Sequence, residues 1–240
     1  LGQRPVERFA ADAGGRSAAG ARQWTGARTL AVFGYWEGRT RPAHATVAAG
    51  ENEWVWSVPL PDGRTNVQCF VDPNAFRRME GSLEDRYRAL IARSAVAADV
   101  SGGLLAGPVS AIDSTSFVAT EPVGENVIRL GDAALALDPI SSSGVQTALQ
   151  TALSGAIVAN TLLRRPSLAR AARQFYRDRL GAAALHHASW AGEHYERAAA
   201  GRSGPFWAAR ARPSVPRPAE AEPVLHETVV LAPEARLVES

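Results

Sequence analysis

The 240-residue sequence contains no lysine, so all 26 of its basic residues are arginine. Any mechanism that uses a lysine base or a lysine Schiff base must therefore obtain that residue from outside this chain. The sequence also has a single cysteine, Cys69, and no cluster of Cys and His with metal-ligand spacing. These absences exclude an internal disulfide, predict no metal site, and favour a reducing compartment, which we take to be the cytoplasm.

Blocks of like charge are missing as well. The formal net charge is +2, and the arginines are interspersed with 24 acidic residues. The pI of about 9.1 therefore does not indicate nucleic acid as a partner. The first residues hold no charged segment followed by an apolar one, so we predict no signal peptide, and the start at Leu1 resembles an internal part of a longer protein.

No charged residue occurs between Pro139 and Leu163, a length that could span a membrane. Polar residues interrupt this stretch at regular intervals: Gln146, Thr147, Gln150, Thr151, Ser154 and Asn160. The apolar residues between them have helical spacing: Val145, Ala148, Leu149, Ala152, Leu153, Ala156 and Ile157. We therefore predict a helix whose apolar face is buried inside the protein, and no membrane as a partner.

The rest of the chain alternates between strand and helix patterns. We predict strands at 6–11, 28–38, 108–120 and 126–130, and a hairpin at 51–71 whose turn is Pro61–Arg64. Ser82 should cap a helix, because two acidic residues and an amphipathic pattern follow it. A helical region at 170–200 should turn these side chains inward: Phe175, Tyr176, Leu180, Leu185, Trp190 and Tyr195. A Pro- and Arg-rich tail with one strand pattern at 227–231 follows Gly201.

The segment GDAALALDPISSSGVQTAL at 131–149 combines features of a ligand site. Asp132 follows a predicted strand, so its carboxylate lies at the carboxyl edge of a sheet, where it can accept hydrogen bonds from ribose-type hydroxyls. The loop after Pro139 leads to Gly144, where a helix begins with free N–H groups, a positive dipole end and no acidic competitor. This helix start suits an anionic oxygen, such as a phosphate or the N1/O2 edge of a reduced flavin.

The same segment resembles the GDAA…DPxxxxGxxxAL motif of FAD-dependent monooxygenases and the tryptophan-halogenase superfamily, which share a glutathione-reductase-like FAD fold. ADAGGRSA at 11–18 and EWVWSVPL at 53–60 resemble that family's DAxGxxS and WxWxIP segments, and the order of the three motifs is the family's order. The resemblance implies FAD as the cofactor, held by Gly131, Asp132, Asp138, Pro139, Ser142, Ser143, Gly144, Val145 and Arg16. It also implies that Trp54 and Trp56 contact the substrate, although residues at i and i+2 on one face of a strand are more often packing residues of the core or the sheet.

The implied fold class is α/β: a fragment of the FAD-binding, glutathione-reductase-like fold with an antiparallel β-sheet substrate domain and C-terminal helices. The expected parts are the end of the FAD-binding domain at 1–28, the β-sheet substrate domain at 29–120, a returning FAD-binding segment at 121–165, a helical C-terminal region at 166–205 and a tail at 206–240.

The implied function is that of an FAD-dependent oxidoreductase. The family's GxGxxG fingerprint and the halogenase lysine are not in this chain, and Ser141 stands where halogenases carry a glutamate. We therefore predict a monooxygenase that hydroxylates an aromatic small molecule or peptide, with a Trp or Tyr side chain of a partner peptide as one candidate. A flavin reductase or NAD(P)H would be the electron source. The alternatives are a flavin-dependent halogenase and a non-catalytic fragment that lacks the N-terminal dinucleotide-binding unit; no catalytic residue is assigned.

Overall fold

The computed structural model describes residues 9–38 and 43–211. The strands are β1 (Ala10–Asp12), β2 (Arg22–Trp24), β3 (Leu30–Glu37), β4 (Thr46–Ala49), β5 (Glu53–Pro59), β6 (Thr65–Val71), β7 (Leu104–Leu105), β8 (Ser110–Asp113), β9 (Phe117–Ala119), β10 (Val127–Arg129) and β11 (Leu135–Ala136). The α-helices are α1 (Pro73–Arg77), α2 (Leu83–Ala92), α3 (Gly144–Arg164), α4 (Ala169–Ala199) and α5 (Pro205–Arg210). Short 3-10 helices are η1 (Gly15–Ala19), η2 (Ala95–Val100), η3 (Gly131–Ala133), η4 (Pro139–Ser141) and η5 (Pro166–Leu168).

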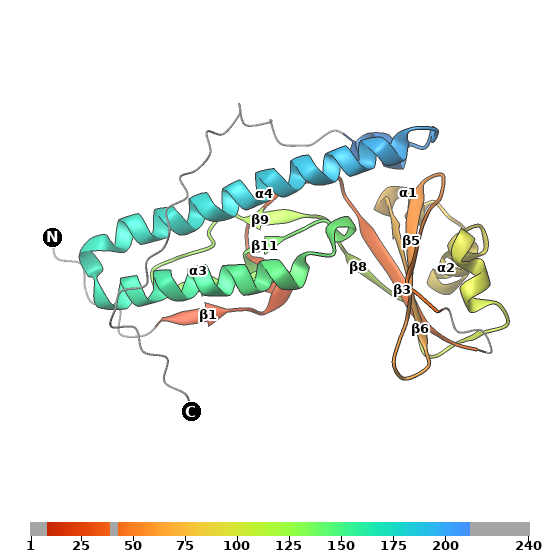
Figure 1. Cartoon of the computed structure of the whole chain (residues 1–240), viewed down its shortest axis with the longest axis horizontal. Helices are drawn as coiled ribbons and strands as arrows, with labels where there is room; N and C mark the ends of the chain where they lie inside the picture. The colour runs from red at the N-terminus through yellow and green to blue at the C-terminus, as the bar shows by residue number, and fades with distance from the viewer. Residues whose placement is uncertain (1–8, 39–42, 212–240) are drawn as a thin grey trace.

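The large sheet has the order β4-β5-β6-β3-β7, with β8 also paired to β3, and its pairs are antiparallel. The predicted strand at 28–38 and the hairpin at 51–71 are confirmed as β3 and as β5 with β6. The turn between β5 and β6 needs Gly63, whose φ of 90° lies in the left-handed region that side chains disfavour. This sheet occupies one end of the molecule in Figure 1.

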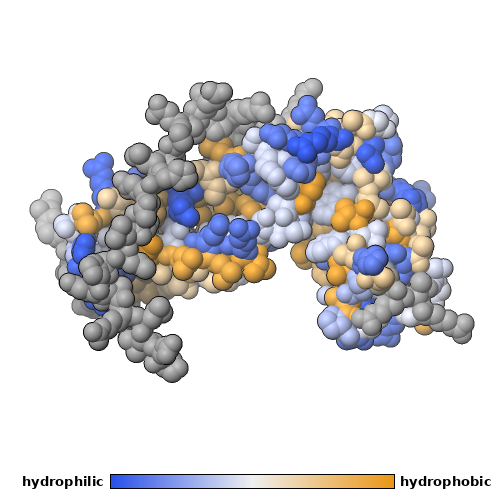
Figure 2. Space-filling model, viewed as in Figure 1, coloured by the Kyte–Doolittle hydropathy of each residue, from blue (hydrophilic) through white to orange (hydrophobic). Residues whose placement is uncertain are grey.

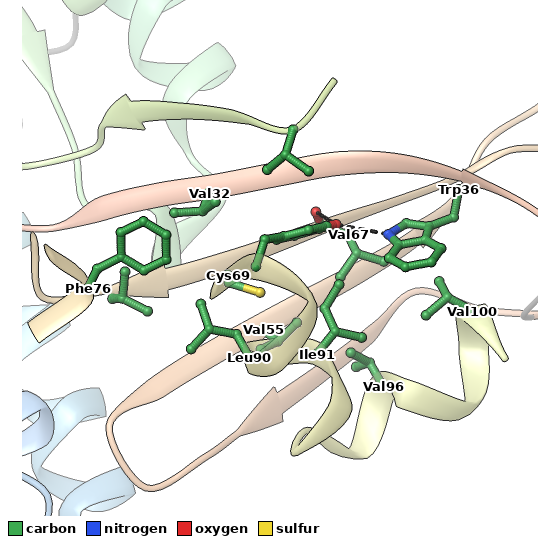
Figure 3. Packing of buried hydrophobic residues seen from close by; sticks show 13 residues of the cluster. Val32, Trp36, Val55, Val67, Cys69, Phe76, Leu90, Ile91, Val96 and Val100 are labelled. Atoms are coloured by element: carbon green, nitrogen blue, oxygen red, sulfur yellow. Dashed lines mark hydrogen bonds between the residues drawn. The ribbon is translucent and has the colours of Figure 1, made fainter. Parts of the chain in front are cut away.

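Helix α2 covers one face of the large sheet and closes its hydrophobic core. Ser82 caps this helix as expected, and its side chain exchanges hydrogen bonds with Asp85 in a capping box. The buried phenol of Tyr87 accepts a hydrogen bond from the Trp36 indole at 3.0 Å and donates to the Val67 carbonyl at 2.9 Å. Figure 3 shows Trp36 and the fully buried Cys69 among the aliphatic side chains of this core, and a dashed line marks the hydrogen bond of the Trp36 indole.

Two small sheets lie at the other end, beside α3 and α4. β1 and β10 pair in parallel, with Asp12 opposite Arg129, and β9 lies between β2 and β11. Segments 10–24 and 117–136 are therefore neighbours, and the large sheet is built from the chain between them. The predicted strand at 126–130 is confirmed as β10. The weak pattern at 108–120 divides into β8 and β9. The strand expected at 6–11 overlaps β1 at residues 10 and 11, and its residues 6–8 lie outside the described residues.

Helix α3 faces the opposite way from our prediction. Its buried residues are Thr147, Thr151, Ser154, Gly155, Val158 and Leu162. The large residues of the expected buried face are 61% to 78% exposed: Val145, Leu149, Leu153 and Ile157. Burying these polar residues costs little free energy, because the hydroxyls of Thr151 and Ser154 donate to backbone carbonyls of the same helix, at 2.9 Å in each case. Figure 2 shows the exposed apolar stripe as an orange band at the position of α3 in Figure 1.

The predicted helix at 170–200 is confirmed as α4, although Leu185 and Trp190 are only partly buried. Tyr176, Leu180 and Tyr195 are buried as expected, whereas Phe175 is 48% exposed. The short helix α5 was missed, although Phe206 and Trp207 on it are buried against Tyr195. Its six residues are too few for a periodicity to be read.

Within the described residues, none of the helices combines the length and the apolar character that crossing a bilayer requires. The strand expected at 227–231 lies outside the described residues.

Candidate functional site

The first part of the site forms where β1 and β10 end side by side. The Leu130 amide donates to the Asp12 carbonyl at 2.8 Å, and the chain then turns at Gly131, whose φ is 56°. The Gly131 amide donates to Thr151 Oγ1 on α3 at 2.8 Å. A Cβ at this position would lie 3.3 Å from the Ala148 Cβ, so glycine is what allows strand and helix to approach this closely.

Asp132 lies next to this contact with a half-buried carboxyl group that accepts no hydrogen bond from the described residues. Burial raises the pKa of Asp132, and the positive charge of Arg16 partly offsets that rise. Burial lowers the pKa of Arg16, whose guanidinium donates to the Thr115 carbonyl and lies 5.1 Å from the centroid of the Phe117 ring. Asp132 and Arg16, 116 positions apart in the sequence, thus form one electrostatic unit.

The Asp-Pro loop is anchored through Asp138, which is only 7% exposed. Its carboxylate caps η4 by accepting from the Ile140 amide at 3.0 Å, and it accepts from the Tyr195 hydroxyl at 2.9 Å. Its own amide donates to His187 Nε2 at 2.9 Å. Burial raises the pKa of Asp138, while these donors and the charges of Arg210 and Arg16 oppose the rise. The side chain that the family resemblance places near the cofactor is therefore turned into the protein.

The three serines after Pro139 shape the approach to α3. Ser142 has φ 51° and ψ 21°, and within the described part of the chain it is the one non-glycine residue in the left-handed region. A side chain in this conformation costs on the order of 1–2 kcal/mol. The Ser141 hydroxyl donates to the Asp138 carbonyl at 3.1 Å and accepts from the Ser143 amide at 3.3 Å. Strained backbone held by local hydrogen bonds is typical of a ligand-binding loop.

Helix α3 begins at Gly144 without a side-chain cap and without an acidic residue in its first turn. The first amides of a helix have no intrahelical acceptor, so those of Gly144 and Val145 are left for a ligand. A Cβ on Gly144 would meet no atom within 4 Å, and Val145 is 78% exposed. The start of this 21-residue helix is therefore an open, positively polarised surface next to the serine loop.

The two tryptophans of β5 differ in burial. Trp54 is 5% exposed and stacks on Phe70, with ring centroids 3.8 Å apart, so it belongs to the core that α5 closes. Trp56, Ile140 and Trp190 pack on the edge of the same cluster and stay partly exposed. Ile140 belongs to the Asp-Pro loop, so this aromatic edge adjoins the loop. Trp190, whose ring centroid lies 3.8 Å from that of His194 with the two planes tilted by 31°, was expected only as an interior residue.

A groove of about 930 Å³ runs between α3 and α4 and ends at the serine loop. Its lining includes polar residues of α3 (Gln146, Thr147, Gln150, Thr151 and Ser154), residues of α4 from Phe175 to Trp190, and Ser141 and Ser143. Of these α3 residues, Thr147, Thr151 and Ser154 are buried beside the groove, whereas Gln146 and Gln150 are exposed. No group of three or more His, Cys, Asp or Glu residues in the described ranges could hold a metal ion.

These features define a class: an α/β protein of the superfamily of FAD-dependent halogenases and monooxygenases. The family model described as tryptophan halogenase matches residues 18–229. The chain belongs to the tryptophan halogenase family.

Two curated relatives show how much of a family member this chain represents. It is 27% identical over 184 residues to a tryptophan 2-halogenase of Chondromyces crocatus, covering 70% of this chain and 35% of that protein. It is 31% identical over 147 residues to a flavin-dependent halogenase of Armillaria mellea, covering 55% of this chain and 28% of that protein. The chain thus spans about a third of the length of these relatives.

Solved structures agree on the fold. The flavin-dependent halogenase CmlS matches with a TM-score of 0.75 and 24% identity, over 84% of this chain and 39% of that one. The peptidyl tryptophan dihydroxylase QhpG matches with a TM-score of 0.74 and 32% identity, over 85% of this chain and 48% of that one. The predicted family and fold class are confirmed.

Proposed function

We propose that this chain supplies the flavin-facing loop and the substrate sheet of an FAD-dependent monooxygenase that hydroxylates an aromatic substrate. The proposal is carried by two features: a half-buried Asp132 carboxylate that accepts no hydrogen bond from the described residues, and an uncapped start of α3 at Gly144. Asp132 follows the carboxyl end of β10, which pairs in parallel with β1, and α3 packs on this turn through Ala148 and Thr151. Ligands of α/β folds bind at this edge of the sheet.

The residues of the site fit FAD. Asp132 can accept hydrogen bonds from the ribityl or ribose hydroxyls, and its raised pKa reflects a carboxylate that burial has deprived of water and that such donors would stabilise. The amides at the start of α3 suit negative charge on the N1/O2 edge of the flavin ring, and the open space over Gly144 leaves room for that ring. The guanidinium of Arg16 adds positive charge near Asp132.

The partly exposed aromatic edge of Trp56, Ile140 and Trp190 is the best candidate for the substrate ring. Trp54 supports this edge from inside the core, where its stacking on Phe70 keeps β5 and β6 in register. When bound, reduced FAD supplies the activation of dioxygen, with electrons from a flavin reductase or from NAD(P)H. The residues of this chain then orient the aromatic ring and exclude water from it.

Ser141 favours hydroxylation over halogenation. The family resemblance implies a glutamate at this position in halogenases. Here the position holds Ser141, whose hydroxyl donates a hydrogen bond to the Asp138 carbonyl. The chain also lacks any lysine. The similarity to QhpG, whose name describes a peptidyl tryptophan dihydroxylase, supports a tryptophan side chain of a peptide as the substrate.

Flavin-dependent halogenation is the second candidate, because the curated relatives described above carry halogenase names. In that case a lysine and an acid would have to come from a part of the protein outside this chain. A non-catalytic fragment is the third reading.

The exposed stripe on α3 supports a larger protein as the functional unit. Its four residues, Val145, Leu149, Leu153 and Ile157, are large apolar side chains at successive helical turns. Contiguous exposed apolar surface of this kind marks an interface. The curated relatives are about three times as long as the matched segment, so we assign the stripe to contact with the dinucleotide-binding unit that such proteins contain.

The test uses the full-length protein with FAD, a flavin reductase, dioxygen and tryptophan- or tyrosine-containing peptides. We expect a gain of about 16 mass units per event, from insertion of one oxygen atom, that does not depend on chloride or bromide. A halide-dependent product of higher mass would replace hydroxylation with halogenation. If neither product forms, although the protein binds FAD, the enzyme assignment itself is wrong.

A further inference from the structure

Asp138 is held by hydrogen bonds within its own loop and by two hydrogen bonds that join it to α4. The Asp138 amide donates to His187 Nε2 at 2.9 Å, and Asp138 Oδ1 accepts from the Tyr195 hydroxyl at 2.9 Å. Within the loop, Asp138 Oδ1 accepts from the Ile140 amide. Asp138, His187 and Tyr195 are 7%, 8% and 1% exposed, so no solvent competes for these bonds.

The geometry fixes the chemical form of both α4 residues. A backbone amide can only donate, so Nε2 of His187 must be the unprotonated nitrogen, and a neutral ring then carries its proton on Nδ1. Tyr195 must donate, because a carboxylate oxygen accepts. His187 and Tyr195 are eight positions apart on one helix, a spacing that places both on the same stripe.

The anchored residue lies close in sequence to the proposed flavin contacts. Asp138 caps η4, and the strained Ser142 follows that turn. Only residues 139–143 separate Asp138 from the start of α3 at Gly144. A displacement of Asp138 would therefore move the loop and the first amides of α3, because so short a segment with internal hydrogen bonds cannot absorb it.

We propose that His187 and Tyr195 are positioning residues: through Asp138 they set the conformation of the serine loop and of the α3 start, and thereby the environment of the flavin ring. This proposal rests on the function proposed above. Neither residue needs to touch the cofactor or the substrate. Helix α4 holds the loop in place through the hydrogen bonds of Asp138 with His187 and Tyr195, which lie 49 and 57 positions away in the sequence.

Four variants and one rescue separate positioning from general packing. His187→Ala removes the acceptor of the Asp138 amide, and His187→Gln returns an acceptor oxygen on a side chain of similar reach. Tyr195→Phe removes one hydroxyl and keeps the ring. The matched controls are His186→Ala, at the adjacent exposed histidine, and Tyr176→Phe, which removes a buried hydroxyl that donates to the Arg129 carbonyl at 2.7 Å.

The first readout is amide hydrogen exchange of this chain without flavin. We expect His187→Ala and Tyr195→Phe to speed exchange across 137–143 by about tenfold, the size of one lost buried hydrogen bond. His187→Gln should restore most of the protection, and the two controls should leave this segment unchanged. Unchanged exchange in 137–143, or acceleration spread evenly over the whole chain, would overturn the proposal.

The second readout is the dissociation constant and the reduction potential of FAD in the full-length protein. We expect weaker binding by about tenfold and a shifted potential in His187→Ala and Tyr195→Phe, with recovery in His187→Gln. If the wild type binds FAD, and His187→Ala changes neither the dissociation constant nor the reduction potential, the positioning role is overturned. If the wild type binds no FAD at all, the proposed function fails, and the exchange experiment still decides whether α4 holds the loop.

Discussion

The buried imidazole of His187 should make folding of this chain depend on pH in a way that one substitution removes. Burial, assisted by the neighbouring His186, lowers the pKa of His187 to about 4. A histidine in the unfolded chain has a pKa of about 6.5. Between these two values the unfolded chain binds a proton that the folded protein does not. The free energy of unfolding contributed by the neutral ring is therefore fully present above pH 6.5 and is lost as the pH falls toward 4.

The size of this loss follows from the two pKa values. One pKa unit corresponds to about 1.4 kcal/mol, so a fall from pH 7 to pH 5 should cost the wild type about 2 kcal/mol through His187 alone. Other groups also titrate, including Asp138, whose raised pKa acts in the opposite direction. These groups are shared with His187→Gln, which lacks the titrating ring, so the difference between the two proteins isolates the histidine.

The assay is urea unfolding of both proteins, followed by tryptophan fluorescence at several pH values from 7 to 5. The stability gap between wild type and His187→Gln should shift by about 2 kcal/mol in favour of the variant as the pH falls. His44→Gln, at an exposed position, controls for the loss of a histidine as such. A gap that stays constant across this range would refute the reasoning, because it would mean that the ring is not held neutral in the folded protein.

Three further outcomes are expected. Gly204→Ala should destabilise the chain by about 1–3 kcal/mol, because a Cβ there would lie 1.9 Å from the Glu51 carbonyl oxygen. Gly181→Ala should instead stabilise α4 by about 0.5–1 kcal/mol in the same unfolding assay, because a Cβ at that position meets no atom within 4 Å. Leu149→Gln should change stability by less than about 0.5 kcal/mol, while Leu162→Ala, at 2% exposure on the same helix, should cost about 2–5 kcal/mol. In the full-length protein Asp132→Ala should lose FAD, because charge-assisted hydrogen bonds worth about 1.5–3 kcal/mol disappear. The measurement is the flavin content of the purified protein, and a variant that purifies with normal flavin content contradicts the proposed site.

The parts of the fold that the sequence predicts are those with strong local patterns. β3 and the hairpin of β5 and β6 are rich in aromatic and β-branched residues, and the turn of the hairpin contains Gly63. Ser82 and the acidic residues after it predict the start of α2. The Gly-Asp and Asp-Pro steps are also local, so a candidate site could be proposed from the sequence alone. The hydrogen bond from Asp138 to His187 has no such signal, because it joins residues 49 positions apart that share no pattern.

Helix α3 shows why even a clear periodicity can mislead. Periodicity identifies the residues that share a face, but it does not say what that face meets. Here the polar face is inexpensive to bury, since Thr151 and Ser154 bond to the helix itself and small residues such as Gly155 let Leu130 approach. The large apolar residues are left outside, where burial by another polypeptide would gain on the order of 1.5–3 kcal/mol for each fully covered side chain. The inverted helix is thus consistent with our proposals: the loop that we assign to the flavin is hydrogen-bonded to α4 through Asp138, and the apolar stripe of α3 is the surface that we assign to the dinucleotide-binding unit of a longer protein.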